Sequence, residues 1–370
     1  MKSFKELVDD YPDILENFLF GNGFSQSFDK NFKYNSLYEN VKDDLANEDI
    51  RLFDEVLHTT NFEIVLNSLL NTEKVVKVFN LYDPCLEMSY QNIKNQLIRA
   101  VQKIHPNYED LSTSLGRLFW TFNIFKRNIF TTNYDLLTYW GLLGIMNSSR
   151  KISDGFFGYS GGDLIFTETN FEPDGLNFHY LHGALHFYEE DGNIIKTRAG
   201  DRFLLERITE QFKKGIFPLY VSEGSTEKKF TQIKSNYYLH TCYTRLLKIS
   251  KGLTIFGQGL AEEYDGHLIN AINHAKNLKY IAYGIYPTES DTKKETKEIS
   301  AIEYRITKLF SDSPYDRNLL FFDSRTFFDS VEEIAYAGLN SFLRTTDIFH
   351  HPEIYLHLYN PDKVKKAPAN

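Results

Sequence analysis

The stretch NIFTTNYDLLTYWGLL, residues 128–143, joins two kinds of secondary structure around a polar turn. Its first four residues have strand character, and an apolar run of helical character follows the turn. The turn itself contains Thr132, Asn133 and Asp135. In open parallel sheets, ligands bind where strands end and helices begin. The stretch therefore predicts a strand-to-helix turn that carries polar side chains to a ligand.

Similar short apolar runs recur along the chain and predict further strands. Most are near-continuously apolar, as in strands that are covered on both faces. Segments of helical period lie between the later runs, and strands that alternate with helices indicate a parallel sheet. We therefore expect an α/β fold with a Rossmann-like, mostly parallel sheet and helices on both faces. The other predicted strands are Asn17 to Phe20, Asn177 to Leu181, Leu219 to Val221, Leu253 to Phe256, Lys279 to Ile285 and Asn318 to Phe322.

The long segment between the first two strands predicts an insertion. Residues 36–125 have helical periodicity throughout, and this is too much chain for one crossover helix. We expect residues 1–35 and 126–340 to form the core, 36–125 to form an inserted helical sub-domain, and 341–370 to form a C-terminal tail. Ser153 to Gly175 is rich in Gly, Asp and Phe and predicts a loop or short hairpin near the site.

Composition limits the classes of function. The formal net charge is -9, which argues against direct nucleic-acid binding, because such surfaces depend on clustered Lys and Arg. Only two cysteines are present, so neither a disulfide framework nor a Cys-rich zinc site is expected. The N-terminus lacks a signal-peptide pattern, and no apolar run approaches the length of a membrane span. We expect a cytoplasmic protein that binds no membrane.

Three other strand ends carry unusual residues. The first strand is followed by Gly21-Asn22-Gly23-Phe24-Ser25, a later one by His182-Gly183, and another by Gly257-Gln258-Gly259. Each also has a purely structural explanation: glycines permit turns, a lone histidine is more often structural, and Thr132 or Asn133 could cap a helix. The dinucleotide fingerprint is incomplete, because Gln26 stands where its third glycine should be. Several such ends on one sheet edge nevertheless favour a ligand site.

These motifs, in this order and spacing, resemble the sirtuin-like superfamily. Its members share a Gly-rich turn after the first strand, an Asn-x-Asp turn, a His-Gly pair and a late Gly-x-Ser-like turn. The segments LFGNGFSQSF, TTNYDLLTYW and YLHGALHFY look like a bacterial branch of that superfamily associated with phage defence and similar to abortive-infection proteins. The resemblance spans about Phe18 to Tyr286.

The resemblance implies cleavage of the bond between nicotinamide and ribose in NAD, which is a substrate here, without a metal. Nicotinamide departs neutral, so no general acid is needed, in contrast to ordinary glycosidases. Asn133 would orient the ribose or a water molecule, and His182, with an ordinary pKa near 6.5, would act as the base. His186 competes for that role if its strand continues. The NAD-binding positions would be Gly21, Asn22, Gly23, Phe24, Ser25, Thr132, Asp135, Gly257, Gln258 and Gly259.

Two departures from the family pattern bear on the acceptor. Deacylating sirtuins usually carry Gln where this chain has Thr132, and they build a zinc module from four cysteines. Water is therefore the expected acceptor, and a regulated defence effector that depletes NAD is the expected role. A catalytically silent nucleotide sensor and an NAD-dependent protein deacylase remain as alternatives. Expected partners are NAD or a related nucleotide, with a homo-oligomer or a defence-system protein as further possibilities.

Overall fold

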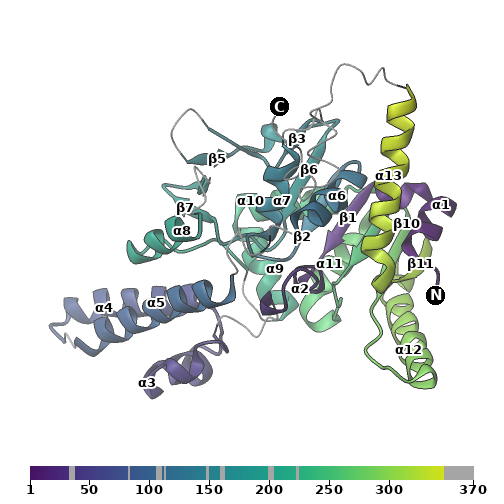
Figure 1. The fold of residues 1–370 in the computed structure, drawn as a ribbon. Coiled ribbons are helices and arrows are strands. Elements are labelled where there is room, and N and C mark those ends of the chain that lie inside the picture. Colours follow the sequence, from purple (N-terminus) through teal and green to yellow (C-terminus); the bar gives the residue numbers. More distant parts are fainter. Residues whose placement is uncertain are drawn as a thin grey trace, which may run out of the picture.

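The computed structural model describes residues 1–32, 38–81, 84–105, 111, 114–146, 150–158, 163–198, 204–221 and 225–345. Its centre is a sheet of seven parallel strands in the order β11-β10-β9-β1-β2-β6-β3, flanked by helices (Figure 1). The predicted α/β fold class is therefore confirmed. The strands are β1 (Asn17–Phe20), β2 (Asn128–Thr131), β3 (Ile152–Ser153), β6 (Leu176–Tyr180), β9 (Ser250–Phe256), β10 (Asn277–Ile285) and β11 (Asn318–Asp323).

A second, antiparallel sheet has the order β4-β5-β8-β7. Part of the predicted loop or hairpin between Ser153 and Gly175 contributes two of its strands. The prediction of a strand from Leu219 to Val221 is wrong, because only Tyr220 pairs there, in a single bridge with Gly183. The strands of this sheet are β4 (Phe156–Phe157), β5 (Leu164–Phe166), β7 (Phe187–Glu190) and β8 (Asn193–Lys196), and the short helix η6 (Glu168–Asn170) follows β5.

Local sequence signals set the ends of several helices. Ser3 and Glu6 form a capping box at the first helix, and Asp291 accepts hydrogen bonds from two backbone N–H groups at the start of α12. The helices outside the long connection are α1 (Phe4–Asp10), η1 (Pro12–Leu15), α2 (Asn22–Gln26), η2 (Lys30–Phe32), α7 (Leu137–Ile145), α8 (Leu204–Lys213), α9 (Thr226–Ser235), α10 (Tyr237–Leu247), α11 (Glu262–His274), α12 (Thr292–Ser311), η7 (Ser324–Thr326) and α13 (Phe327–Thr345).

The long connection, residues 36–125 between β1 and β2, contains no strand among its described residues. Its elements are η3 (Lys42–Asp44), α3 (Asn47–Arg51), η4 (Leu52–Val56), α4 (Phe62–Val78), α5 (Pro84–Ile104) and α6 (Leu115–Ile124). Helices α4 and α5 pack against each other and project away from the sheet (Figure 1), whereas α6 packs on α7 and α13. Division of the chain into a core and an inserted sub-domain stays a prediction, and residues 346–370 of the predicted tail lie outside the described residues.

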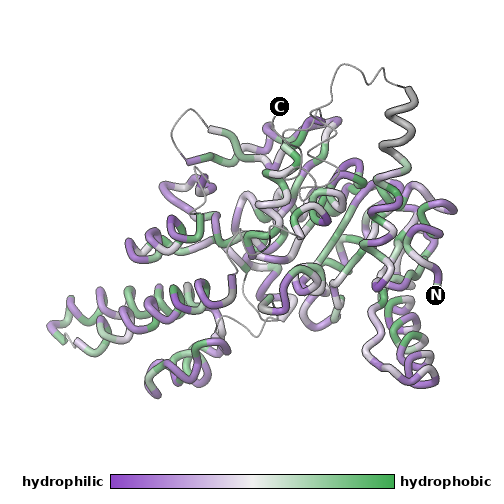
Figure 2. Tube along the Cα trace, viewed as in Figure 1, coloured by the Kyte–Doolittle hydropathy of each residue, from purple (hydrophilic) through white to green (hydrophobic). Residues whose placement is uncertain are grey.

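The core follows from the apolar strands. All four residues of β1 are buried, and the ring of Phe18 stacks on Phe125 with a centroid distance of 4.3 Å. Figure 2 shows apolar residues along the central strands, while the projecting helices alternate apolar and polar residues. In the part of the chain that the structure describes, no helix is both long and apolar enough to cross a bilayer.

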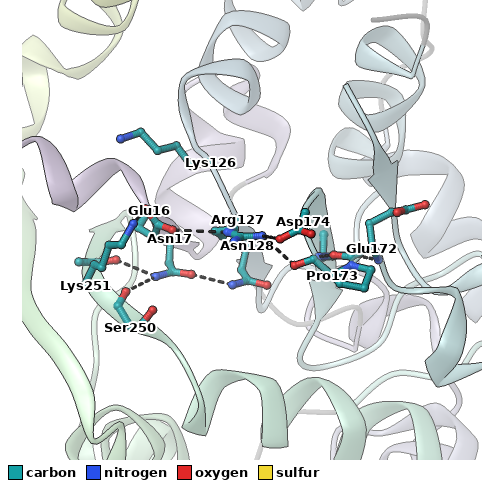
Figure 3. Close-up of polar contacts among 12 residues, drawn as sticks. Glu16, Asn17, Lys126, Arg127, Asn128, Glu172, Pro173, Asp174, Ser250 and Lys251 are labelled. Carbon is teal, nitrogen blue, oxygen red and sulfur yellow. Dashed lines mark hydrogen bonds and ion pairs between the residues drawn. The ribbon is translucent and has the colours of Figure 1, made fainter. Parts of the chain in front are cut away.

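A row of asparagines lies where three neighbouring strands begin. Asn17, Asn128 and Asn177 are in register across β1, β2 and β6. Asn128 Nδ2 donates to Asn17 Oδ1 at 2.7 Å, and Asn17 Nδ2 donates to backbone carbonyls of Ser250 and Gly252 (Figure 3). These side chains lie at the edge of the sheet opposite the predicted ligand edge, so the row has a structural role.

Candidate functional site

The polar turn after β2 is organised by its own side chains. Thr131 Oγ1 accepts from the Asn133 N–H at 3.0 Å, and Asp135 Oδ1 accepts from the Leu137 N–H at 2.9 Å. Asp135 therefore supports the start of α7, a task that the sequence suggested for Thr132 or Asn133. This leaves the side chains of Thr132 and Asn133 available for other contacts.

Asn133 joins the turn to the Gly-rich turn after β1. Its Nδ2 donates to the Gly21 carbonyl at 3.0 Å and to Ser25 Oγ at 2.8 Å. Ser25 Oγ in turn donates to Asp135 Oδ2 at 2.6 Å. Among the described residues, Asn133 Oδ1 has no hydrogen-bond partner. Both donors of the carboxamide are therefore used within the protein, and its acceptor is the group that can contact a ligand.

The two Gly-rich turns pack backbone against backbone. The N–H groups of Gly21 and Gly23 donate to the carbonyls of Phe256 and Gly257, at 3.2 and 2.9 Å. A Cβ added to Gly23 would lie 2.7 Å from Gly257 Cα, and Gly257 itself has a φ of +63°. Glycine is needed here for close approach. Because these two amides already have carbonyl partners, they are not free to bind a phosphate.

Gln258 crosses from the late turn to the turn after β2. Its Oε1 accepts from Thr132 Oγ1 at 2.9 Å, and its Nε2 donates to Asp265 Oδ2 at 3.1 Å. A Cβ added to Gly21 would lie 1.8 Å from Gln258 Oε1. The Gln258 carboxamide therefore covers Gly21 and lies beside the turn that holds Asn133.

A cavity of about 690 Å³ opens at this edge of the sheet. Gly23, Gly257, Gln258 and Gly259 line it together with residues of β10 and α12. Its size is within the range of small-molecule sites. Asn133 and His182 do not line it. The predicted Gly-rich turns thus share a cavity. Asn133 is buried and does not line it, whereas Gln258 lines the cavity and contacts the turn that holds Asn133.

His182 comes from the loop beside Asn133. The loops after β2 and β6 are joined by a hydrogen bond from the Leu181 N–H to the Thr131 carbonyl, at 2.8 Å. The His182 side chain is only 6% exposed, and its Nε2 lies 2.9 Å from His267 Nε2 of α11. No hydrogen bond joins it to Asn133 among the described residues. The structure brings the two loops together and gives each side chain its own partners.

Burial changes the acid–base character of the histidine pair. Desolvation, followed by the neighbouring His267 and Lys229, holds the pKa of His182 well below its usual 6.5. Desolvation and Lys229 lower the pKa of His267 to about 4. The expectation of an ordinary pKa for His182 is therefore wrong. Both rings are neutral at pH 7, and only one of the facing Nε2 atoms can carry a hydrogen.

His186 lies elsewhere. β6 ends at Tyr180, and Gly183 adopts a φ of +75°, so the strand does not continue to His186. His186 is fully buried against Tyr139 and Phe187, and its ring nitrogens have no hydrogen-bond partner among the described residues. The condition under which it would compete with His182 as the base is not met.

His267 is the residue that sequence reasoning missed. It lies on α11 among buried Leu268, Ile269 and Ile272, and no motif surrounds it. The one signal is a histidine within an apolar helix, which ordinarily indicates a structural role.

We expect the buried histidines to make the fold sensitive to acid. Burial lowers the pKa of His105, His179, His182, His186 and His267 in the folded state, so the unfolded chain takes up protons first as the pH falls. Stability is fully present above about pH 6.5 and declines toward pH 4, where His267 protonates in the fold. Urea midpoints measured from pH 7.5 to 5 should fall, and His267→Gln should reduce the slope. A flat profile would contradict this assignment.

Most of the chain matches one protein family. The model of a family described as "Domain of unknown function (DUF4917)" matches residues 18–327. A solved structure described as "Structural Basis for the Mechanism and Regulation of Sir2 Enzymes" is 10% identical, with a TM-score of 0.37, over 92% of this chain and 99% of that chain. No curated protein matches the sequence.

Proposed function

This chain belongs to the DUF4917 family, and we propose that it hydrolyses NAD to nicotinamide and ADP-ribose. One observation carries the proposal: the acceptor oxygen of Asn133 has no hydrogen-bond partner among the described residues, and Asn133 lies at the ligand edge of a parallel sheet, near a Gly-lined cavity. The motif resemblance described above supplies the substrate. The adenosine end of NAD would occupy the cavity, and the nicotinamide ribose would extend past Gln258 toward Asn133.

In the proposed reaction, Asn133 positions a reacting group and His182 accepts a proton. Asn133 Oδ1 accepts a hydrogen bond from a ribose hydroxyl or from the attacking water. The bond from ribose C1′ to the pyridinium nitrogen breaks with both electrons going to nicotinamide, and the water oxygen bonds to C1′. The water proton passes to His182. Because Nε2 of His182 faces His267, the nitrogen that receives this proton is Nδ1.

His267 would hold His182 in the required tautomer. If His182 carries its hydrogen on Nε2 and donates it to His267 Nε2, its Nδ1 lone pair stays open. His267 then carries its own hydrogen on Nδ1, which has no partner among the described residues. The lowered pKa of His182 keeps the base unprotonated at neutral pH.

We propose that turnover is regulated, as a defence effector that depletes NAD would require. Asn133 is 2% exposed and Gln258 lies between its turn and the cavity, so the site is closed in this structure. A trigger that moves Gln258 would open the path to Asn133. The motif resemblance to phage-defence proteins is the support for this biological role.

Incubation of the purified protein with NAD tests the activity. Nicotinamide and ADP-ribose, separated by chromatography and identified by mass, are the expected products. His182→Ala should reduce their formation, and full activity in that variant would refute the role of His182. Tight NAD binding without turnover under any condition would favour the silent sensor. Formation of O-acyl-ADP-ribose from an acylated peptide would favour the deacylase instead.

A further inference from the structure

A second cavity, of about 760 Å³, lies along α7. Tyr139 and Leu142 of α7 form one wall, and Phe156, Phe157 and Phe171 supply aromatic surface. Ligand pockets are usually apolar and aromatic with a few placed polar groups. The aromatic character of this cavity suits a planar ring.

The polar groups in its wall are a buried ion pair. Lys196 Nζ of β8 contacts Asp154 Oδ2, and the two side chains are 5% and 4% exposed. Asp154 Oδ1 also accepts from the Phe156 N–H at 3.2 Å. A buried ion pair contributes little net stability compared with apolar packing. Its place in a cavity wall therefore calls for a second explanation.

The hydrogen-bonding capacity of the pair is incomplete. An ammonium has three donors, and among the described residues Asp154 is the hydrogen-bond partner of Lys196 Nζ. The ammonium also lies over the rings of Phe156 and Tyr139, at 5.2 and 5.6 Å from their centroids. Two donors are thus available to an acceptor in the cavity, and the Asp154 oxygens retain lone pairs for a donor.

Further buried polar side chains lie near the pair, because the Tyr139 ring contacts both Lys196 Nζ and His186, and His186 contacts Tyr180. Tyr180 Oη and both ring nitrogens of His186 are buried without a hydrogen-bond partner among the described residues. Unpartnered buried polar groups are costly and rare in native proteins. Their presence next to the ion pair indicates that this part of the interior has a role besides packing.

The cavity wall carries equal numbers of basic and acidic side chains, which favours a neutral ligand. Two basic side chains, Lys196 and Arg198, are matched by two acidic ones, Asp154 and Glu172. We propose that the cavity binds a small neutral molecule whose planar aromatic ring bears a carbonyl acceptor beside an N–H donor. The carbonyl would accept from Lys196, the N–H would donate to Asp154, and the ring would pack on Phe156 and Phe157. A primary carboxamide and the lactam edge of a nucleobase both present this pattern.

Isothermal titration of the full-length protein with benzamide and with uridine distinguishes these two sources. We expect at least one probe to bind, and benzoate and benzylamine to bind at least fivefold more weakly. Asn133→Ala should leave the affinity within twofold, which separates this cavity from the NAD site and from the outcome of the hydrolysis assay.

Variants of the cavity provide the decisive comparison. Phe157 is 64% exposed, so Phe157→Ala should fold normally and weaken binding at least fivefold. Ile165→Ala is the matched control, because Ile165 is exposed on the paired strand and does not line the cavity. The double variant Lys196→Met with Asp154→Leu should abolish binding. Failure of both probes to bind at millimolar concentration, or equal affinity in Phe157→Ala and the parent, would overturn the proposal.

Discussion

Replacement of Asn133 by alanine is expected to reduce nicotinamide release from NAD by about 100- to 1,000-fold, the loss typical of a polar group that acts on the transition state. The variant removes the Oδ1 acceptor and also the two hydrogen bonds from Nδ2 to Gly21 and Ser25. Nicotinamide release and NAD affinity should both be measured. We expect NAD affinity to change less than fivefold, because the cavity proposed for the adenosine end does not contain Asn133.

Two controls show whether the loss is chemical. Asn193→Ala, at an exposed position of β8, should leave activity and melting temperature unchanged. The melting temperature of Asn133→Ala should fall, because buried hydrogen bonds are lost at about 1 to 3 kcal/mol each when a partner stays unsatisfied. Retention of full turnover would refute the role of Asn133. Loss of NAD binding together with turnover would indicate collapse of the Gly-rich turn instead.

Replacement of Gly183 by alanine is expected to have the largest effect on stability. Gly183 has a φ of +75°, and an added Cβ would lie 2.1 Å from the Leu219 carbonyl oxygen. That carbonyl accepts the Ala184 N–H, so it cannot withdraw without breaking a hydrogen bond. The left-handed conformation costs about 1 to 2 kcal/mol and overpacking about 1 to 3 kcal/mol. The free energy of unfolding should fall by about 2 to 5 kcal/mol.

Gly192→Ala separates the two costs. Gly192 has nearly the same φ, +74°, but nothing lies within 4 Å of an added Cβ. It should lose only about 1 kcal/mol, the cost of the backbone conformation. Denaturant unfolding of both variants measures the difference. Equal losses would mean that the contact with Leu219 relaxes freely.

The strands of the main sheet could be predicted because their sequences are buried on both faces. β1 and β2 are short and apolar, and turn residues follow each of them, so their positions and ends are clear from the chain alone. The segment from Leu219 to Val221 has the same apolar character but forms only one bridge. Strand formation also needs a partner, and sequence character does not supply that information.

The site was predicted in part for a similar reason. Strand ends meet at one edge of a parallel sheet, so the turns that carry Gly21, Asn133 and Gly257 could be placed together. The hydrogen-bond partners of each side chain could not be predicted. The contact of His182 with His267 spans 85 residues, and the one between Ser25 and Asp135 spans 110. Such contacts depend on how α2 and α11 pack, which no local pattern reports.

The row of asparagines at the start of the strands has a consequence for the opposite edge. Each strand in the row is only four or five residues long, so its far end is held at a fixed offset from its asparagine. A shift of β2 by one residue would break the Asn17 to Asn128 hydrogen bond and turn its side chains to the other face. It would also move Asn133 about 3.3 Å along the strand axis, out of reach of Gly21. The alignment of Asn133 with its partners is thus set at the far end of the strand, by the Asn17 to Asn128 hydrogen bond.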